Sequence, residues 1–216
     1  MARRESIIIA TQMDITLYSI NIDEKLESFY AEALKILPPE RVEKALRYRF
    51  EKDRRLSLAA GMLIREATGG KEIKLEADGK PYAEGGPFFN VSHSGSMVIC
   101  AAGTCPVGCD IEEVKADTEK IAKRFFTREE QEYIEESGNR EEAFAEIWTL
   151  KESFMKAVGL GLSLPMTEFS ILMGNPVKVI HSVNNKKYSC ARVERFLPYR
   201  CAVCAETEEE INILYL

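Results

Sequence analysis

The sequence predicts an α+β protein built from two similar halves, because one order of elements occurs twice along its 216 residues. In each half, a long stretch with apolar residues at helical spacing ends at glycines, and short segments of alternating polarity follow. The segments that close the two helical stretches, AAGMLIREATGG and LKESFMKAVGLG, also correspond in arrangement. We therefore expect two halves, 1–104 and 105–216, joined near residues 103–106, with any shared site in the cleft between them.

The first half begins with a strand-like alternation at residues 14–22, and a helical pattern follows at 24–37. A Pro-Pro pair breaks that helix. A second helical pattern, basic on one side, then spans 40–67 until a Gly-Gly pair ends it. Short strands are expected after it at residues 73–76, 88–92 and 97–102, separated by turns at 78–81 and 85–86.

The second half repeats this order with a strand at 107–114 and a helix at 118–125. Thr127 and Glu130 have the spacing of a capping box, which predicts the start of another helix. The long helix of this half is expected at 140–158, where two glycines stop it. Strands are expected to follow at 169–173, 177–182, 188–196 and 200–205.

Composition indicates a soluble globular protein, with 45% hydrophobic and 30% charged residues. No stretch approaches the ~20 apolar residues of a membrane span, and the opening MARRESIII lacks the apolar core of a secretory signal. We therefore expect a cytoplasmic protein that does not bind membranes. A net charge of −6 argues against nucleic-acid binding, although local basic clusters suit a small polyphosphate. The six cysteines lack zinc-knuckle spacing, which favours reduced core thiols over structural zinc.

Lys151 stands where a hydrophobic residue belongs. At about 100° per residue, it falls inside an apolar arc of the long helix that includes Trp148, Phe154 and Met155. An ammonium among apolar neighbours is strongly destabilised unless an anion meets it. The side chain therefore either reaches out to solvent or binds something negative.

Asp110 and Glu112, in the segment GCDIEEV, point to the same face of the strand expected at 107–114. They are about 6.5 to 7 Å apart along the chain, so the two carboxylates repel each other. Two interpretations stay open: both face solvent at a sheet edge, or they form a site for a hard cation such as Mg²⁺. Glu152, on the long helix, is a candidate third carboxylate.

The segment FNVSHSG places Ser92 and His93 at the end of a strand, where hydroxyls, an imidazole and loop amides suit an anion such as phosphate. A structural histidine is the alternative. Nucleophilic catalysis is disfavoured, because neighbouring strand residues face opposite ways and the GxSxG elbow is absent. Lys80, in the turn DGKPY, and the basic helix would add cations for a phosphate-rich ligand.

The motifs GKP, FNVSHS, GCDIE, FFTREE and WTLKESFMKAVGLGL, in this order, resemble the Sfp-type (surfactin-synthetase-activating) 4′-phosphopantetheinyl transferases. The specific part of the match is WxxKESxxKxxGxGL together with GxDIE. The resemblance implies the fold of that family, with two α+β halves related by pseudo-two-fold symmetry. It also implies an enzyme that moves the phosphopantetheine arm of coenzyme A to a serine of an apo acyl or peptidyl carrier protein, releasing adenosine 3′,5′-bisphosphate.

Carried over by position, the family pattern makes Asp110, Glu112 and Glu152 the ligands of Mg²⁺, with Mn²⁺ as an alternative ion. By the same resemblance, Lys151 and Lys156 are cations beside the pyrophosphate, which would be the anion that meets Lys151. Glu152, or a water that it orients, is the candidate general base, and Asp110 and Lys156 are the other candidate catalytic residues. The implied contacts to coenzyme A are Arg41, Lys44, Lys80, Ser92 and His93, with His93 near the 3′-phosphate.

The carrier protein is expected at residues 115–139, by resemblance and because this polar segment follows the carboxylate strand. Two other functions stay open: a non-catalytic module that binds coenzyme A or a carrier, and a Mg²⁺-dependent phosphohydrolase. The internal repeat favours a monomer, and the sequence does not indicate which carrier or pathway is served. Because such carriers are typically acidic, basic side chains here are candidate contacts, with ordinary surface charge as the alternative: Lys115, Lys120, Lys123, Arg124 and Arg128.

Overall fold

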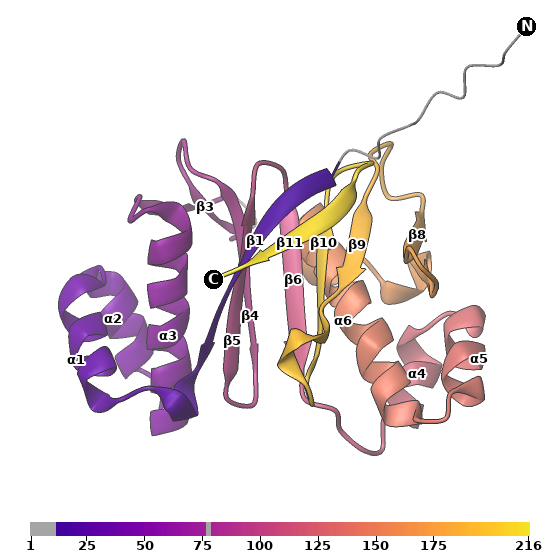
Figure 1. Ribbon diagram of the computed structural model, residues 1–216, viewed down its shortest axis with the longest axis horizontal. Helices are drawn as coiled ribbons and strands as arrows, with labels where there is room; N and C mark the ends of the chain where they lie inside the picture. The colour runs from indigo at the N-terminus through magenta and orange to yellow at the C-terminus, as the bar shows by residue number, and fades with distance from the viewer. Residues whose placement is uncertain (1–11, 77–78) are drawn as a thin grey trace, which may run out of the picture.

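The computed structural model describes residues 12–76 and 79–216, which form layers of helices, sheet, sheet and helices (Figure 1). The predicted α+β class is confirmed. The prediction for the opening MARRESIII, and residue 78 of the predicted turn, lie outside the described residues. Within the described ranges, no helix combines the length and the apolarity needed to cross a membrane.

The first sheet has the strand order β11-β1-β5-β4. β5 (Met97–Gly103) pairs antiparallel with β1 (Gln12–Asn21) on one side and with β4 (Phe88–Ser94) on the other. β11 (Glu210–Tyr215), from the far end of the chain, pairs parallel with β1. β4 is therefore an edge strand of this sheet.

Helices α1 (Glu27–Ile36), α2 (Pro39–Leu46) and α3 (Glu51–Thr68) lie outside the first sheet (Figure 1). α3 packs directly on it, because Leu56 and Leu63 join the strands' apolar side chains in one buried cluster. Apolar residues every three or four positions along α3 supply this contact face.

The single helix predicted at 40–67 is wrong, because residues 47–50 interrupt it. Arg54 holds this interruption in place: its Nε donates to the carbonyl oxygen of Tyr48 at 2.8 Å, and its Nη2 to that of Arg49 at 3.2 Å. No glycine or proline marks the break, so helical periodicity alone could not detect it.

The second sheet has the order β6-β10-β9 and is antiparallel. It contains β6 (Val107–Glu112), β9 (Ser189–Arg192) and β10 (Arg200–Ala205). α6 (Arg140–Val158) packs on its outer face, and the predicted bounds of this long helix are confirmed. It ends at Gly159, whose φ of +88° is readily adopted by glycine.

Smaller elements complete the fold. α4 (Glu119–Phe125) and α5 (Arg128–Glu136) lie beside α6, and the predicted capping box of Thr127 and Glu130 is confirmed at the start of α5. The strand β3 and the strand β11 were not predicted. The remaining elements are β2 (Ile73–Leu75), β3 (Pro81–Ala83), β7 (Phe169–Leu172), β8 (Lys178–His181), η1 (Ile22–Glu24), η2 (Gly161–Ser163), η3 (Met166–Glu168) and η4 (Glu194–Phe196).

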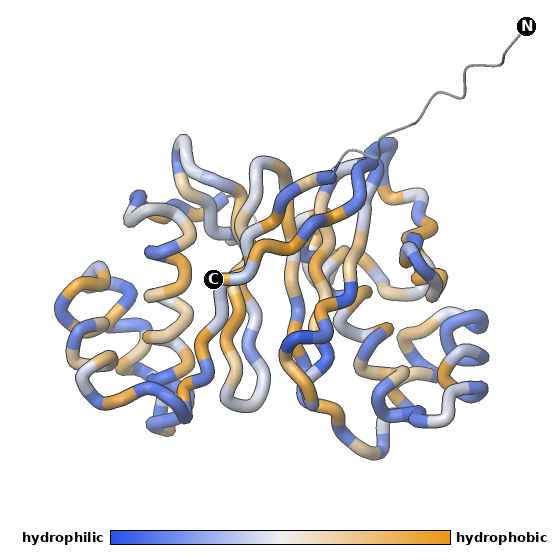
Figure 2. The backbone as a smooth tube through the Cα atoms, in the orientation of Figure 1, coloured by the Kyte–Doolittle hydropathy of each residue, from blue (hydrophilic) through white to orange (hydrophobic). Residues whose placement is uncertain are grey.

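The two sheets pack face to face through a shared apolar cluster. Ile15 and Ile99 of the first sheet meet Ile111 and Val203 of the second. Figure 2 shows this distribution as orange along the central strands and blue around α4 and α5. All six cysteines are free thiols and five of them are buried. The division at residues 104 and 105 stays a prediction, and one strand of the second range, β11, lies in the first sheet.

Candidate active site

The candidate site lies where β4, β6 and α6 meet. β4 and β6 are edge strands of different sheets, and side-chain hydrogen bonds join them. The bonds advance in the same direction along both strands: Asn90 with Cys109, Ser92 with Asp110, and Ser94 with Glu112. This joint places the carboxylates of β6 at the junction of the two sheets.

Gly108 allows β6 to lie directly against α6. A Cβ added at Gly108 would be 2.1 Å from the carbonyl oxygen of Ser153 and 2.5 Å from the backbone nitrogen of Ala157. Both contacts are helix backbone atoms, which cannot rotate away as a side chain would. Because Asp110 shares the Gly108 face of the strand, this close approach brings its carboxylate to the helix.

The variant Gly108→Ala is expected to lower the free energy of unfolding by about 3 kcal/mol, because the strand or the helix must shift to accept the methyl group. Urea denaturation followed by circular dichroism measures the change. Gly138→Ala is the control, because no atom lies within 4 Å of a Cβ added there. Equal stability of Gly108→Ala and the unchanged protein would contradict the close contact.

Asp110 is 3% exposed and its two oxygens differ in their surroundings. Oδ1 accepts a hydrogen bond from Ser92 Oγ at 2.7 Å and forms an ion pair with Lys156 Nζ at 2.6 Å. Oδ2 is buried and has no hydrogen-bond partner among the described residues. A buried carboxylate oxygen without a partner is costly. It therefore marks a place where a cation from outside the chain would be stabilised.

Glu112 and Glu152 lie within electrostatic reach of Asp110. Burial raises the pKa of both carboxyls, and the charge of Asp110 raises each pKa further. The Ser94 hydrogen bond opposes this for Glu112, and the charge of Lys156 opposes it for Glu152. Glu112 also raises the pKa of Glu152. The three sequence-predicted carboxylates thus lie within range of one another's charge, and a divalent cation would relieve their repulsion.

Lys156 reaches this group from α6. Besides its ion pair with Asp110, Nζ lies 3.2 Å from Ser92 Oγ and 3.3 Å from the carbonyl oxygen of Cys109. Burial is the largest single influence and lowers the pKa of Lys156, but Asp110 outweighs it through charge and hydrogen bonding, so the pKa is raised. The side chain is therefore a fixed cation one helical turn from Glu152.

The donor chemistry fits a hard metal ion, although no complete ligand cage is formed. In the part of the chain that the structure describes, no three His, Cys, Asp or Glu side chains are grouped closely enough to hold a metal. Lys156 neutralises Asp110 in this arrangement. The residues present still supply oxygen ligands only, one of them buried and unpaired, which is the donor set that suits Mg²⁺.

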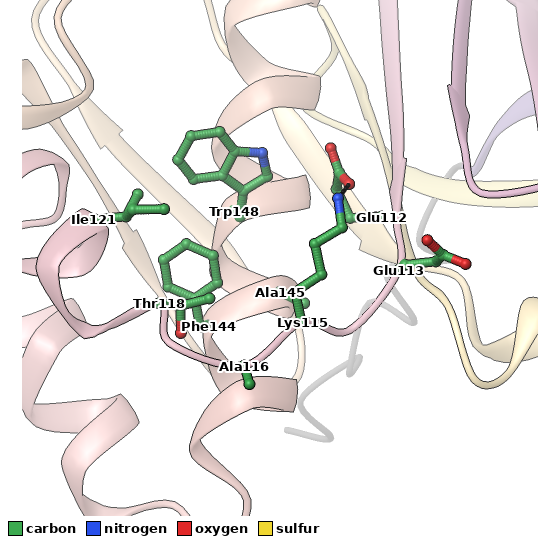
Figure 3. Close-up of a pocket in the computed structure, with 9 residues that line it drawn as sticks. All are labelled: Glu112, Glu113, Lys115, Ala116, Thr118, Ile121, Phe144, Ala145 and Trp148. Carbon is green, nitrogen blue, oxygen red and sulfur yellow. Dashed lines mark ion pairs between the residues drawn. The ribbon is translucent and has the colours of Figure 1, made fainter. Parts of the chain in front are cut away.

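An apolar pocket of about 210 Å³ opens beside Glu112 (Figure 3). Figure 3 shows Ile121, Phe144 and Trp148 on one side of it, with Lys115 and Glu112 on the other. The Phe144 and Trp148 rings stack with centroids 5.7 Å apart, which makes that wall firm. Lys115 Nζ lies 3.8 Å from Glu112 Oε2, so residues after β6 are in direct contact with the carboxylate group.

Lys151 does not belong to this site, which corrects the expectation that it meets the pyrophosphate. Its side chain is 0% exposed. Nζ donates to Glu130 at 2.6 and 2.9 Å and to the carbonyl oxygen of Phe169 at 2.9 Å. Glu130 also accepts from the backbone nitrogen of Ile171 at 2.7 Å. The anion that stabilises Lys151 is therefore Glu130, not a substrate or Glu152.

Ser92 and His93 differ in their exposure and their contacts. Ser92 is 8% exposed and its hydroxyl donates to Asp110, and its contact to the adenosine end of coenzyme A stays a prediction. His93 is exposed and follows Ser92 on β4. Its pKa is lowered by partial desolvation first and by the charge of Lys156 second, so the imidazole lies within reach of the same cation.

The basic residues expected to bind coenzyme A lie at three places. Lys80 Nζ donates to the carbonyl oxygen of Lys156 at 2.9 Å, which links the GKP turn to the end of α6. Arg41 lies along α3: Nη2 donates to the carbonyl oxygen of Ser57 at 2.8 Å, while Nε is buried without a hydrogen-bond partner among described residues. Lys44 is exposed on α2.

Sequence reasoning missed Ser94 as part of the site and Asn90 as part of the joint between β4 and β6. Together with Ser92 they are polar residues at every second position of FNVSHS, a spacing that puts them on one face of a strand. That alternation was the available signal.

Two family models together match residues 24–204 of the chain. The model "4′-phosphopantetheinyl transferase, N-terminal" matches residues 24–105, and "4′-phosphopantetheinyl transferase superfamily" matches 106–204. The 4′-phosphopantetheinyl transferase Sfp of Bacillus subtilis strain 168 is 32% identical over 205 residues, covering 88% of this chain and 91% of the relative. The 4′-phosphopantetheinyl transferase psf-1 of Bacillus pumilus is 32% identical over 211 residues, covering 89% and 91%. A solved holo-(acyl-carrier-protein) synthase from Bacillus anthracis, in complex with CoA (3′,5′-ADP), is 18% identical, with a TM-score of 0.41 over 46% of this chain and 93% of its own.

Proposed function

The chain belongs to the 4′-phosphopantetheinyl transferase superfamily and is a 4′-phosphopantetheinyl transferase, and from this premise we propose that Asp110, Glu112 and Glu152 form its Mg²⁺ site. The enzyme transfers the 4′-phosphopantetheine arm of coenzyme A to a carrier-protein serine. The observation that carries the metal proposal is the buried, unpartnered Oδ2 of Asp110. Burial, with a further contribution from the charge of Asp110, raises the pKa of the two other carboxylates, Glu112 and Glu152. Mn²⁺ offers the same preference for oxygen ligands and is an alternative ion.

The chain's own residues divide the chemistry between them. When bound, Mg²⁺ would draw negative charge from the pyrophosphate under attack. Lys156 holds a positive charge at the same place and stabilises the departing adenosine 3′,5′-bisphosphate. Glu152 is the proposed base that takes the serine proton, directly or through a water that it orients.

We place the nucleotide end of coenzyme A on the first half, with the 3′-phosphate beside the exposed His93. Lys80 supports this placement, because its contact with Lys156 puts a second cation at the end of α6. Arg41 and Lys44 are proposed as further phosphate contacts from α2. An approach from this side brings the pyrophosphate to Lys156 and leaves the Glu112 side open for the second substrate.

The carrier protein is proposed to bind residues 115–139, which follow β6 and include α4 and α5. Lys115 lies against Glu112, so a carrier held by this segment presents its serine close to the carboxylates. The apolar pocket of Ile121, Phe144 and Trp148 offers a place for an apolar carrier side chain beside the basic residues. Charge would attract an acidic partner, and the pocket would fix its position.

Reversing one charge on α4 tests this surface. Lys120→Glu is expected to raise the KM for an acidic carrier by about three- to tenfold, while the KM for coenzyme A stays unchanged. Added salt should reduce the difference, because it screens exposed charges. Lys35→Glu, on the exposed surface of α1, is the matched control. An equal effect of both variants would show that net charge, and not this surface, matters.

The function is tested by incubating the protein with coenzyme A, Mg²⁺ and an apo carrier, and then weighing the carrier. We expect a gain equal to one phosphopantetheine group. Transfer should stop in EDTA and return with Mg²⁺, and transfer that persists in EDTA would remove the metal proposal. Bisphosphate release with an unmodified carrier would indicate a phosphohydrolase. Coenzyme A binding without either product would indicate a non-catalytic module.

We also propose that the enzyme is a cytoplasmic monomer with two halves, 1–104 and 105–216, that binds neither nucleic acid nor membranes. The serines of β4 and the carboxylates of β6 that they contact belong to the same chain, which supports a site formed within one chain. Light scattering after size-exclusion chromatography measures the mass in solution. A dimer at working concentration would contradict this proposal.

A further inference from the structure

Two serines of β4 hold the two carboxylates of β6 in the same way. Ser92 Oγ donates to Asp110 Oδ1 and lies 3.2 Å from the ammonium of Lys156. Ser94 Oγ donates to Glu112 Oε2 at 2.8 Å and accepts from the backbone nitrogen of Glu113 at 3.1 Å. Each hydroxyl therefore has a nitrogen donor on one side and a carboxylate on the other.

The direction of the Ser94 hydrogen bond is fixed by chemistry. A serine hydroxyl has a single proton, and its oxygen is already the acceptor for an N–H group from Glu113. An ionised carboxylate can only accept, so the hydroxyl proton points to Glu112 Oε2. Ser94 is 7% exposed, which shields this bond from competing water. The bond therefore fixes one oxygen of Glu112.

The hairpin that carries Ser94 is held independently of this bond. The backbone nitrogen of Ser96 donates to the Tyr199 hydroxyl at 3.2 Å, and that hydroxyl lies 3.4 Å from Glu113 Oε1. Gly95 has a φ of +57°, and a Cβ there would be 2.4 Å from the same tyrosine oxygen. Loss of the Ser94 hydroxyl would thus leave the hairpin in place and release the Glu112 carboxylate together with the backbone nitrogen of Glu113.

Lys115 is the cation that would attract the Glu112 carboxylate if the Ser94 hydrogen bond were lost. Its Nζ is 3.8 Å from Oε2, the oxygen that Ser94 holds. Without the serine hydroxyl, this ammonium draws the carboxylate toward the pocket side of the strand (Figure 3). The choice between Ser94 and Lys115 therefore decides where the carboxylate points.

We propose that Ser94 is a positioning residue for the transfer reaction. Its hydrogen bond opposes the attraction of Lys115 for the Glu112 carboxylate and keeps that carboxylate directed to the divalent cation. This inference rests on the proposed metal site. Asn90 provides the comparison with a purely structural role. It lies two positions before Ser92 on the same face of β4 and joins β4 to β6 without contacting a carboxylate. Removing Asn90 should weaken the joint but leave metal binding unchanged.

The test compares Ser94→Ala, Ser94→Thr and Asn90→Ala in the full-length protein, with circular dichroism confirming the fold. Two quantities are measured: the Mg²⁺ concentration for half-maximal transfer, and the dissociation constant of Mn²⁺ by electron paramagnetic resonance without carrier. Ser94→Ala should raise both by about tenfold, because a hydrogen bond to a charged group is lost. Ser94→Thr, which keeps the hydroxyl, and Asn90→Ala should both stay within about twofold. If Ser94→Ala fails to fold, Ser94→Cys replaces it. The thiol is a weaker hydrogen-bond donor, so both measured quantities should again rise.

Different failures are distinguishable. Unchanged Mn²⁺ affinity in Ser94→Ala, or equal weakening in Asn90→Ala, would overturn the role of Ser94 while leaving the metal site intact. If the protein without substitutions binds no Mn²⁺ and transfers fully in EDTA, the proposed metal site is wrong, and the proposed role of Ser94 is wrong with it.

Discussion

Replacing Glu130 by glutamine is expected to lower the free energy of unfolding by about 3 to 5 kcal/mol, because it leaves the Lys151 ammonium buried without its counter-charge. Both side chains of this pair are 0% exposed, so water cannot compensate. The same carboxylate accepts from Thr127 and Ile171 backbone nitrogens, and a glutamine can satisfy only part of this set. Urea denaturation at neutral pH measures the loss.

Two further variants isolate the pair. Glu129→Gln, which removes an exposed charge from the same helical turn, should lower stability far less than Glu130→Gln. The double variant Glu130→Leu/Lys151→Met should be more stable than Glu130→Gln, since no buried charge remains. Equal stability of Glu130→Gln and Glu129→Gln would contradict the assignment of Glu130 as the partner of Lys151.

Replacing Asp110 by asparagine is expected to reduce kcat/KM for carrier modification by about a hundred- to a thousandfold. The change keeps the shape of the side chain but removes the charge that holds Lys156 and the anionic oxygen proposed to bind Mg²⁺. Glu152→Gln should act in the same direction, because it removes a second carboxylate and the proposed base. The rate of holo-carrier formation, followed by mass spectrometry, measures both effects.

The control for these variants is Glu208→Gln, which neutralises an exposed carboxylate before β11. Its rate should match that of the unchanged protein. Circular dichroism at the assay temperature separates lost chemistry from lost fold. Transfer by Asp110→Asn at a rate within tenfold of the unchanged protein would contradict the central place of this carboxylate.

The sequence was sufficient to predict features that depend on residues close together in the chain. The helix at Arg140–Val158 was predicted at its observed bounds, because a regular apolar pattern ends at a glycine that adopts a positive φ. The alternation of GCDIEEV correctly put Asp110 and Glu112 on one strand face, and both now contact serines of β4. These features depend on neighbours within a few residues.

Long-range pairing was beyond the sequence. Periodicity showed that Lys151 occupies an apolar arc, but its partner lies 21 residues away on another helix, where Glu130 had already been explained by the capping box. The Glu130 carboxylate both caps the helix and pairs with Lys151, and no local sequence pattern indicates the pairing. The parallel pairing of β11 with β1 joins Asn212 to Asp14 in the same way, across most of the chain.

That last pairing makes the outer edge of the first sheet dependent on the far end of the polypeptide. A fragment that stops before Glu210 would leave β1 with a row of open amide and carbonyl groups, which invites association with another copy. Expressing the two halves as separate fragments would therefore separate a strand from its own sheet. Any division of this protein for laboratory use should carry Glu210–Tyr215 with the first half, because that is where the segment is paired.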